Sequence, residues 1–474
     1  MKKTFYLLFA AVSALVLGAC SSDDDAAVQE DFVVAFENPS LSFSAEEDTK
    51  DVNLEFSTTA PHDGTVTIGF TPTNVVYGQD EDFVTTPNAM ENEIIVDFSE
   101  GDEGASFSFR KLKDAIEGNE KSITFQIQSV SLENGLAGGT TSILVSFEET
   151  AALGGTMAPE VGGPNQPNQV YVDLSAQNQT AVSRDSWDLG FYSGDEFRVI
   201  INGSLYMAAA ELDAIDIDAV TEEDVAELQT TVAVGTFDPT NTAYIDSPEG
   251  DLSKTAISEI SAEDSENKVY LLNLGSEVGT EDPDAGSVDI TDDPRGWMKI
   301  RILQSENGYT LQYAPLDSDA HTEVTITKDA AYNFQYFSLK NEEEVMAQPA
   351  QGEWDLLFTV FTNEITGAGS YGYADYIVTN RLDGVEAYQV ENESVAYADF
   401  NSEGVDATLF EEDQRAIGSN WRNGGGPGTL PSLKENVYFV IKDSAGNLYK
   451  LKFTSLLDEN GTRGYPSFEY ALIQ

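Results

Sequence analysis

The sequence predicts an all-β protein, and three observations lead to that fold class. Short runs rich in Val, Ile, Thr, Phe and Tyr alternate apolar and polar residues, as at residues 65–70, 94–98, 107–110 and 122–127. Gly, Asn or Asp bounds these runs, which is typical of strands joined by turns. Helical patterns are few, and the clearest stretch, residues 207–228, is interpreted as a helix pair or a long loop.

The chain opens with a segment that predicts export. Lys2 and Lys3 precede an apolar run over residues 5–17. This run is too short to span a bilayer comfortably, and its basic start is typical of a signal peptide. We therefore expect residues 1–19 to be a signal peptide and not a transmembrane helix.

Cys20 is the predicted lipidation site. The letters LGAC that end at Cys20 resemble a lipobox, in which small residues precede the cysteine that takes up the lipid. Residues 20–30 would then form a lipidated acidic tether. The letters SSDDD directly after Cys20 resemble the surface-export signal of Bacteroidetes lipoproteins, which implies an outer-membrane lipoprotein facing the cell exterior. The alternative is an ordinary signal sequence that ends in Cys by chance.

The charge of the chain restricts its partners. The formal net charge is −59, from 24 Lys and Arg residues against 83 Asp and Glu residues. A surface without basic patches cannot release counterions from phosphate groups, which excludes nucleic acid and leaves membrane contact to the lipid anchor alone. Because Cys20 is the single cysteine, the fold must depend on buried apolar area and not on disulfides.

The composition divides the chain into domains. Residues 31–150 carry the alternating runs of a first β domain, and residues 151–168 lose that alternation to Gly, Pro, Asn and Ala, which predicts a linker. Beyond it, VYVDLSAQNQTAVSRDSWDLGFY is echoed by FQYFSLKNEEEVMAQPAQGEWDLLFT. We therefore predict two related β units, residues 169–328 and 329–474.

Each unit carries a Trp-Asp-Leu triplet, at residues 187–189 and 354–356. A structural role is predicted for both, because Trp buries a large ring and Asp accepts hydrogen bonds from a neighbouring turn. Two predicted hairpins also match in sequence, MKIRILQSENGYTLQY and VYFVIKDSAGNLYKLKF, with turns at Asn307-Gly308 and at residues 445–447.

These motifs give the C-terminal region a resemblance to the HmuY-like haem-binding lipoproteins of Bacteroidetes. The resemblance rests on the WDLGF and WDLLF strands, on strands that end in Asn202 and Asn380, and on the closing hairpin before FEYALI. It implies an all-β surface lipoprotein that captures haem as a small-molecule ligand and passes it to an outer-membrane receptor.

The same resemblance places an axial haem ligand just past the Trp-Asp strand. Tyr192 stands there in the first unit and Thr359 in the second. A tyrosine can ligate ferric haem and a threonine is a poor ligand, so Tyr192 is the candidate, together with Met207 and His321. The residues themselves favour another interpretation, in which His321 is a polar loop residue and Met207 a packing residue.

The first domain resembles a Calx-β or related Ig-like sandwich. The resemblance rests on Asp82-Phe83, on the strand EIIVDF, and on KDAIEGNEKSITFQI. It implies either a calcium site formed by carboxylates or a spacer without metal. The candidate calcium ligands are Asp82, Asp114, Glu117 and Glu120.

The sequence does not predict an enzyme. Its two histidines, His62 and His321, stand in no catalytic motif, and the HExxH, P-loop and dinucleotide fingerprints are lacking. Two alternatives to haem capture stay open. One is a structural or adhesive lipoprotein that binds another protein, and the other is a surface glycan-binding protein that stacks sugars on Trp421, Tyr371 and Tyr373.

Overall fold

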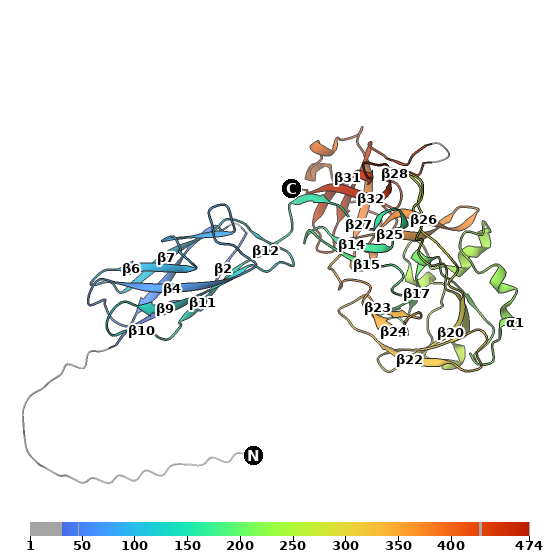
Figure 1. The fold of residues 1–474 in the computed structure, drawn as a ribbon, viewed down its shortest axis with the longest axis horizontal. Coiled ribbons are helices and arrows are strands. Elements are labelled where there is room, and N and C mark those ends of the chain that lie inside the picture. The colour runs from blue at the N-terminus through green and yellow to red at the C-terminus, as the bar shows by residue number, and fades with distance from the viewer. Residues whose placement is uncertain (1–30, 46, 426–428, 474) are drawn as a thin grey trace, which may run out of the picture. The chain divides into compact units, whose positions relative to one another are not determined.

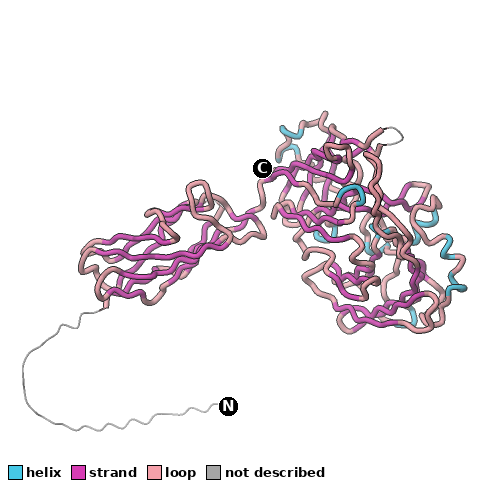
Figure 2. Tube along the Cα trace, in the orientation of Figure 1, coloured by secondary structure: helices cyan, strands magenta, loops and turns pink. Residues whose placement is uncertain are grey.

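The structure is a computed structural model that describes residues 31–45, 47–425 and 429–473. The predicted signal peptide and Cys20 lie outside these residues. The chain forms two compact units, of which the first runs to Lys113 and resumes over Lys121–Glu148, and the second comprises Asp114–Glu120 and the chain from Glu149. Strands dominate both units, and the helices are short (Figures 1 and 2). In the described part of the chain, no helix is long and apolar enough to cross a bilayer.

The first unit is a sandwich of two five-stranded sheets. One sheet has the order β10 (Gly135–Ala137), β1 (Phe32–Phe36), β3 (Thr49–Phe56), β7 (Gly104–Lys111) and β5 (Phe83–Thr86). The other has the order β2 (Ser40–Phe43), β11 (Ser142–Phe147), β9 (Ser122–Val130), β4 (Gly64–Thr73) and β6 (Glu93–Phe98).

The core of this sandwich follows from the alternation of the sequence. Strand β6 alternates exposed and buried residues throughout, as a strand with one solvated face should. Phenylalanine rings fill the space between the sheets; for example, Phe83 and Phe109 stack with ring centroids 5.1 Å apart. All four runs predicted as strands in this region lie in strands, so this part of the prediction is confirmed.

The second unit contains two five-stranded sheets. The first has the order β18 (Ala208–Glu211), β19 (Val269–Asn273), β20 (Trp297–Ser305), β21 (Gly308–Pro315) and β22 (Thr322–Thr327). The second has the order β27 (Glu386–Glu391), β30 (Val437–Lys442), β31 (Leu448–Leu457), β32 (Arg463–Leu472) and β13 (Gly154–Met157).

Two four-stranded sheets complete the paired architecture. One has the order β17 (Val199–Ile201), β16 (Leu189–Tyr192), β23 (Phe334–Ser338) and β24 (Glu343–Val345). The other has the order β15 (Asn178–Ser183), β14 (Asn168–Asp173), β25 (Leu356–Ile365) and β26 (Gly369–Thr379). Two short ribbons pair β8 (Ala115–Ile116) with β12 (Glu149–Thr150), and β28 (Arg422–Asn423) with β29 (Ser432–Leu433).

The helices of the described residues are one α-helix, α1 (Glu222–Val225), and short 3-10 turns. The 3-10 turns are η1 (Gly163–Asn165), η2 (Gly203–Leu205), η3 (Leu228–Thr230), η4 (Pro239–Tyr244), η5 (Leu252–Lys254), η6 (Asp264–Glu266), η7 (Arg381–Asp383), η8 (Tyr397–Asp399) and η9 (Ser402–Gly404).

The segment 207–228 is not a helix pair. It begins with strand β18, and its only α-helical turn is α1. The alanines that suggested a helix are strand residues with both faces covered, since Ala208 and Ala210 belong to one apolar core and Ala209 to another. Small side chains suit a strand that is packed on both sides.

The two repeats exchange their opening strands. Strand β14 of the first repeat pairs with β25 of the second, and β23 of the second repeat pairs with β16 of the first. The edge strands of the two five-stranded sheets are exchanged in the same way. Strand β13 precedes the first repeat and pairs with β32 of the second, and β22 directly precedes the strands of the second repeat and pairs with β21 of the first. Residues 154–157, inside the predicted linker, therefore form a sheet strand, and each repeat is completed by the other.

Both predicted hairpins form, but they are not equivalent in the sheets. Strands β30 and β31 follow β27 directly in sheet order, and their counterparts after β18 are β19 and β20. The hairpin β20–β21, whose sequence resembles that of β30–β31, therefore lies one strand further along its sheet than β30–β31 does in the other sheet. The sequence match reflected shared hairpin composition and not equivalent position.

Candidate functional site

The Trp-Asp corner of the first repeat fastens the exchanged strand β23. The Asp188 carboxylate accepts a hydrogen bond from the backbone N–H of Leu339 at 2.6 Å, directly after β23. The side-chain amide of Asn202 donates to the backbone oxygen of Trp187 at 2.8 Å. The Trp187 ring packs edge-on against Tyr336 of β23, with centroids 4.8 Å apart.

The corner of the second repeat has the same geometry on strand β14. The Asp355 carboxylate accepts from the backbone N–H of Leu174 at 2.8 Å. The amide of Asn380 donates to the backbone oxygen of Trp354 at 3.0 Å, and the Trp354 ring lies 5.0 Å from that of Tyr171. The structural role predicted for both Trp-Asp pairs is confirmed, and the corners define matching positions in the two repeats.

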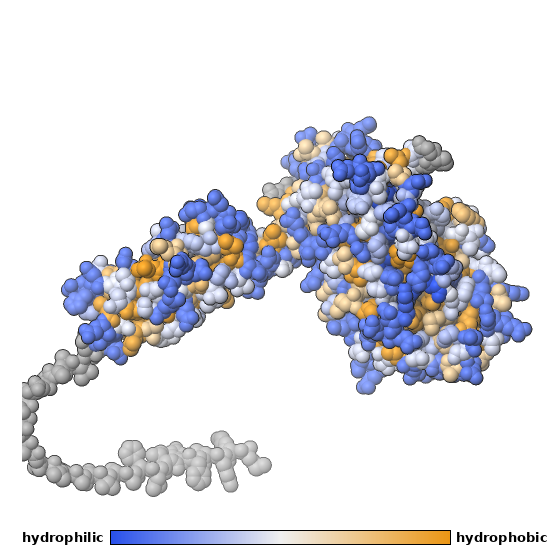
Figure 3. Space-filling view, viewed as in Figure 1, coloured by the Kyte–Doolittle hydropathy of each residue, from blue (hydrophilic) through white to orange (hydrophobic). Residues whose placement is uncertain are grey.

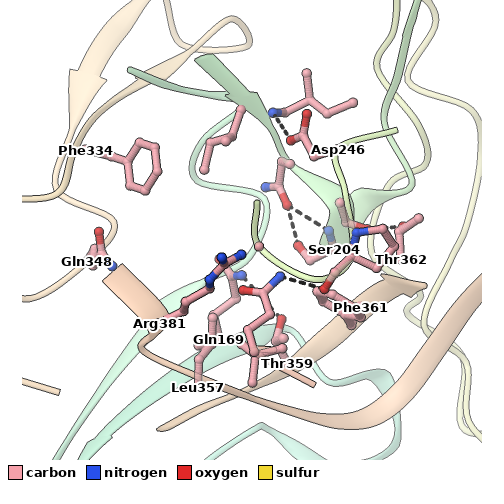
Figure 4. Close-up of a pocket in the computed structure, with 18 of the residues that line it drawn as sticks. Gln169, Ser204, Asp246, Phe334, Gln348, Leu357, Thr359, Phe361, Thr362 and Arg381 are labelled. Atoms are coloured by element: carbon pink, nitrogen blue, oxygen red, sulfur yellow. Dashed lines mark hydrogen bonds between the residues drawn. The ribbon is translucent and has the colours of Figure 1, made fainter. Parts of the chain in front are cut away.

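A cavity of about 190 Å³ lies between the two corners (Figure 4). Its wall takes matching residues from both repeats, among them both corner tryptophans and both asparagines, and it is mostly apolar. The four aromatic residues of the corners, from β14, β23 and the two Trp-Asp pairs, all contribute to it: Tyr171, Trp187, Tyr336 and Trp354. A concave apolar site with a few polar groups is the usual form of a small-molecule site.

One buried polar group in this wall lacks a partner. The indole nitrogen of Trp354 has no hydrogen-bond partner among the described residues. Trp354 is buried, with 6 % of its residue surface exposed. An unsatisfied buried group costs about 1–3 kcal/mol, so a ligand that bonds to this nitrogen would recover that free energy.

Two ionisable residues complete the cavity wall. Asp246 accepts hydrogen bonds from the backbone N–H groups of Ile201 and Ala256, at 2.8 and 2.9 Å. Burial raises the pKa of Asp246 to about 7, although the two N–H groups partly oppose this effect. Arg381 donates to the backbone oxygen of Glu249 at 3.2 Å. Figure 4 shows both side chains at the pocket.

The structure does not bring the predicted haem-binding residues together. Met207 is buried and lines the cavity. Tyr192 lies outside the cavity wall and packs on Phe334, with ring centroids 5.7 Å apart. His321 also lies outside it, with its Nδ1 atom 2.9 Å from the carboxylate of Asp218.

Haem does not fit the cavity as it stands. The volume of about 190 Å³ lies below the roughly 300 Å³ at which pockets for drug-sized ligands begin. The wall contains no His or Cys among its described residues. Its tyrosines Tyr171 and Tyr336 are poor sources of a phenolate, because burial raises the pKa of each well above its usual value.

The predicted calcium ligands do not form a metal centre. Among the described residues, no group of three or more His, Cys, Asp or Glu side chains is placed to hold a metal ion, and this includes Asp82, Asp114, Glu117 and Glu120. Asp82 is instead engaged by the ammonium group of Lys121 at 2.9 Å and by the backbone N–H of Val76 at 2.8 Å. Burial acts to raise the pKa of Asp82, but these two contacts outweigh it and lower the pKa.

The three aromatic residues named for glycan stacking differ in how far they are exposed. Trp421 is 1 % exposed, stacks on Phe453 at 4.4 Å, and donates its indole N–H to the backbone oxygen of Asp375. It therefore offers no open ring face. Tyr371 is 40 % exposed and its ring lies 5.5 Å from that of Tyr373, so these two alone stand together near the surface.

Sequence reasoning missed Arg381 and Asp246. Arg381 directly follows Asn380, the predicted end of a strand, so the repeat could have directed attention to it. Asp246 lies in the long segment between β18 and β19, for which the second repeat offers no matching motif.

A concave, mostly apolar cavity between two interlocked β modules is the form expected of a small-molecule binding protein. The sequence model of the HmuY protein family matches twice, over residues 165–305 and 330–470. The matches span more than half of the chain, so the protein belongs to the HmuY family. The duplication and the resemblance found in the sequence are thereby confirmed.

Other comparisons add little. No curated protein sequence matches this chain. A Calx CBD1 domain in its apo form is 13 % identical over 24 % of this chain and 96 % of its own, with a TM-score of 0.21. A putative carbohydrate-binding protein from Bacteroides ovatus is 12 % identical over 73 % of this chain and 97 % of its own, with a TM-score of 0.23. At such TM-scores, neither likeness carries an argument about function.

Proposed function

We propose that this protein is a lipid-anchored binding protein of the outer membrane that faces the cell exterior. It captures a small, largely apolar ligand in the cavity between its two HmuY repeats and delivers it to an outer-membrane receptor for uptake. It is not an enzyme, and the sandwich of its first unit serves as a spacer.

One observation carries this proposal. Two interlocked repeats contribute matching residues to one cavity, and one wall residue, Trp354, has a buried indole nitrogen without a partner among the described residues. A protein core normally satisfies such groups, and a ligand site is where they are expected to stay open. The lipobox at Cys20 and the acidic residues after it support a surface location.

Haem or a related porphyrin is the second candidate ligand. Membership of the HmuY family favours it, and so does the thioether of Met207 in the cavity wall, which is a known type of haem ligand. Haem would require the two repeats to open around the cavity, because the present volume is too small.

Titration of hemin into residues 21–474, followed by the visible absorption spectrum, tests this candidate. Capture of haem through Met207 predicts a saturable Soret shift that Met207→Leu weakens and Tyr192→Phe leaves unchanged. If Tyr192→Phe weakens the shift and Met207→Leu leaves it unchanged, Tyr192 is the haem ligand instead. An unchanged spectrum excludes haem and leaves the small apolar ligand.

A further inference from the structure

The two halves of the cavity differ at two matching positions that concern hydrogen-bond donors. The first is the partner of the corner tryptophan. Trp187 donates its indole N–H to the side-chain oxygen of Gln169 at 2.8 Å. Phe334 occupies the position of Gln169 in the other repeat, as the registers of β14 and β23 show. The indole of Trp354 therefore has no acceptor.

The second difference follows the matching asparagines Asn202 and Asn380. Arg381 stands where the first repeat has Gly203, which adds a guanidinium group. Both residues line the cavity. Thr379 pairs with Leu356 and shares its face of the sheet, which packs into an apolar core, so its hydroxyl faces away from the cavity.

The chemistry of these groups specifies what they bind. An indole nitrogen can only donate a hydrogen bond, and a guanidinium only donates and carries a positive charge. Arg381 forms no salt bridge among the described residues, and its hydrogen bond goes to a backbone oxygen. An indole donor beside a positively charged guanidinium matches a carboxylate, which accepts through both oxygens.

The acidic residues of the wall are already engaged. Asp246 accepts two backbone hydrogen bonds, from Ile201 and Ala256. Asp251 forms a salt bridge with Lys254 at 3.0 Å. Neither competes for the indole of Trp354, which remains without a partner.

We infer that the ligand is a small organic acid with a single ring, whose carboxylate binds Trp354 and Arg381 while its ring lies against the aromatic side chains of the two corners. This inference rests on the proposed function. The volume of about 190 Å³ suits one ring better than a porphyrin.

The test uses isothermal titration of residues 21–474 with phenylacetate, benzoate and cyclohexanecarboxylate. Phenylacetamide serves as the neutral analogue of phenylacetate, and hemin is included. We expect at least one acid to bind saturably and at least tenfold more tightly than phenylacetamide. Trp354→Phe and Arg381→Gln should each weaken that binding at least fivefold.

A control variant separates the site from general effects of substitution. Ser370 lies on strand β26, and like the indole of Trp354 its buried hydroxyl lacks a partner among the described residues, but it does not line the cavity. Ser370→Ala should leave acid binding unchanged. Circular dichroism of each variant verifies folding.

The failures are distinguishable. If hemin or phenylacetamide binds and no acid does, the carboxylate inference is wrong while the proposed function stands. If an acid binds and both cavity variants bind it as well as the unmodified protein does, the inference is also wrong, because the acid then binds elsewhere. If no probe of the panel, hemin included, binds at all, the proposed function itself is overturned together with the inference.

Discussion

The two Trp-Asp corners have the same backbone geometry and different electrostatics. Asp188 of the first repeat is fully buried and pairs with Arg295 at 2.7 Å. The described residues provide no such cation for Asp355. Burial, together with the charges of Asp173 and Asp443, raises the pKa of Asp355 well above its usual value.

The comparison teaches that duplication preserves hydrogen bonds more strictly than charge balance. In both corners the aspartate must accept the backbone N–H of an exchanged strand, because that contact fixes the strand. The first corner is then completed by an ion pair and by Gln169, whereas the second keeps a costly carboxylate and an unpartnered indole. The second corner is therefore the one in which binding can replace missing internal contacts.

The largest expected effect comes from breaking the ion pair of the first corner. Arg295→Met leaves the buried carboxylate of Asp188 without its cation, and removal of one partner of a buried pair typically costs about 3–5 kcal/mol. Chemical denaturation monitored by circular dichroism measures the loss. A loss below about 1 kcal/mol would show that the pair does not distinguish the corners.

The pH dependence of stability examines the second corner. Because the folded protein holds a proton on Asp355 more tightly than the unfolded chain, the stabilisation is complete below the unfolded pKa of about 3.9 and is lost as pH rises through the folded pKa. One such group changes the free energy of unfolding by at most about 1.4 kcal/mol per pH unit. Asp246 acts in the same direction up to its pKa of about 7.

Melting temperatures from pH 5 to pH 9 measure this dependence. Asp355→Asn cannot ionise, so its melting temperature should fall less steeply with rising pH than that of the unmodified protein. Equal slopes in the two proteins would contradict the assignment to Asp355.

The smallest effect is the difference between the corner tryptophans. Trp187→Phe leaves the oxygen of Gln169 without its donor, which costs about 1–2 kcal/mol in addition to the lost ring volume. Trp354→Phe loses the same volume but removes a donor that has no partner. Without ligand, Trp187→Phe should therefore destabilise the protein more than Trp354→Phe does. Chemical denaturation measures both variants, and equal midpoints would show that the two tryptophans do not differ in their hydrogen bonding.

Much of the second unit was recognisable in the sequence. The Trp-Asp pairs, the strand-ending asparagines Asn202 and Asn380, and the aromatic strands before them occupy corresponding places in the structure. These features are local in sequence or repeat at a fixed distance. The residues that line the cavity are harder to predict from the sequence. The prediction of Tyr192 rests on its offset from the Trp-Asp pair, and that offset does not show on which side of a sheet a cavity lies.

The sequence by itself determined the all-β class, the sandwich ahead of a duplicated region, and the roles of the corner residues, because alternation and turn chemistry act over a few residues. Only the tertiary structure decided that the repeats exchange strands and enclose a cavity. Any strand of suitable alternation can pair with several partners, and the choice depends on packing between segments far apart in the chain. Whether a buried indole or hydroxyl finds a partner is decided by that same packing.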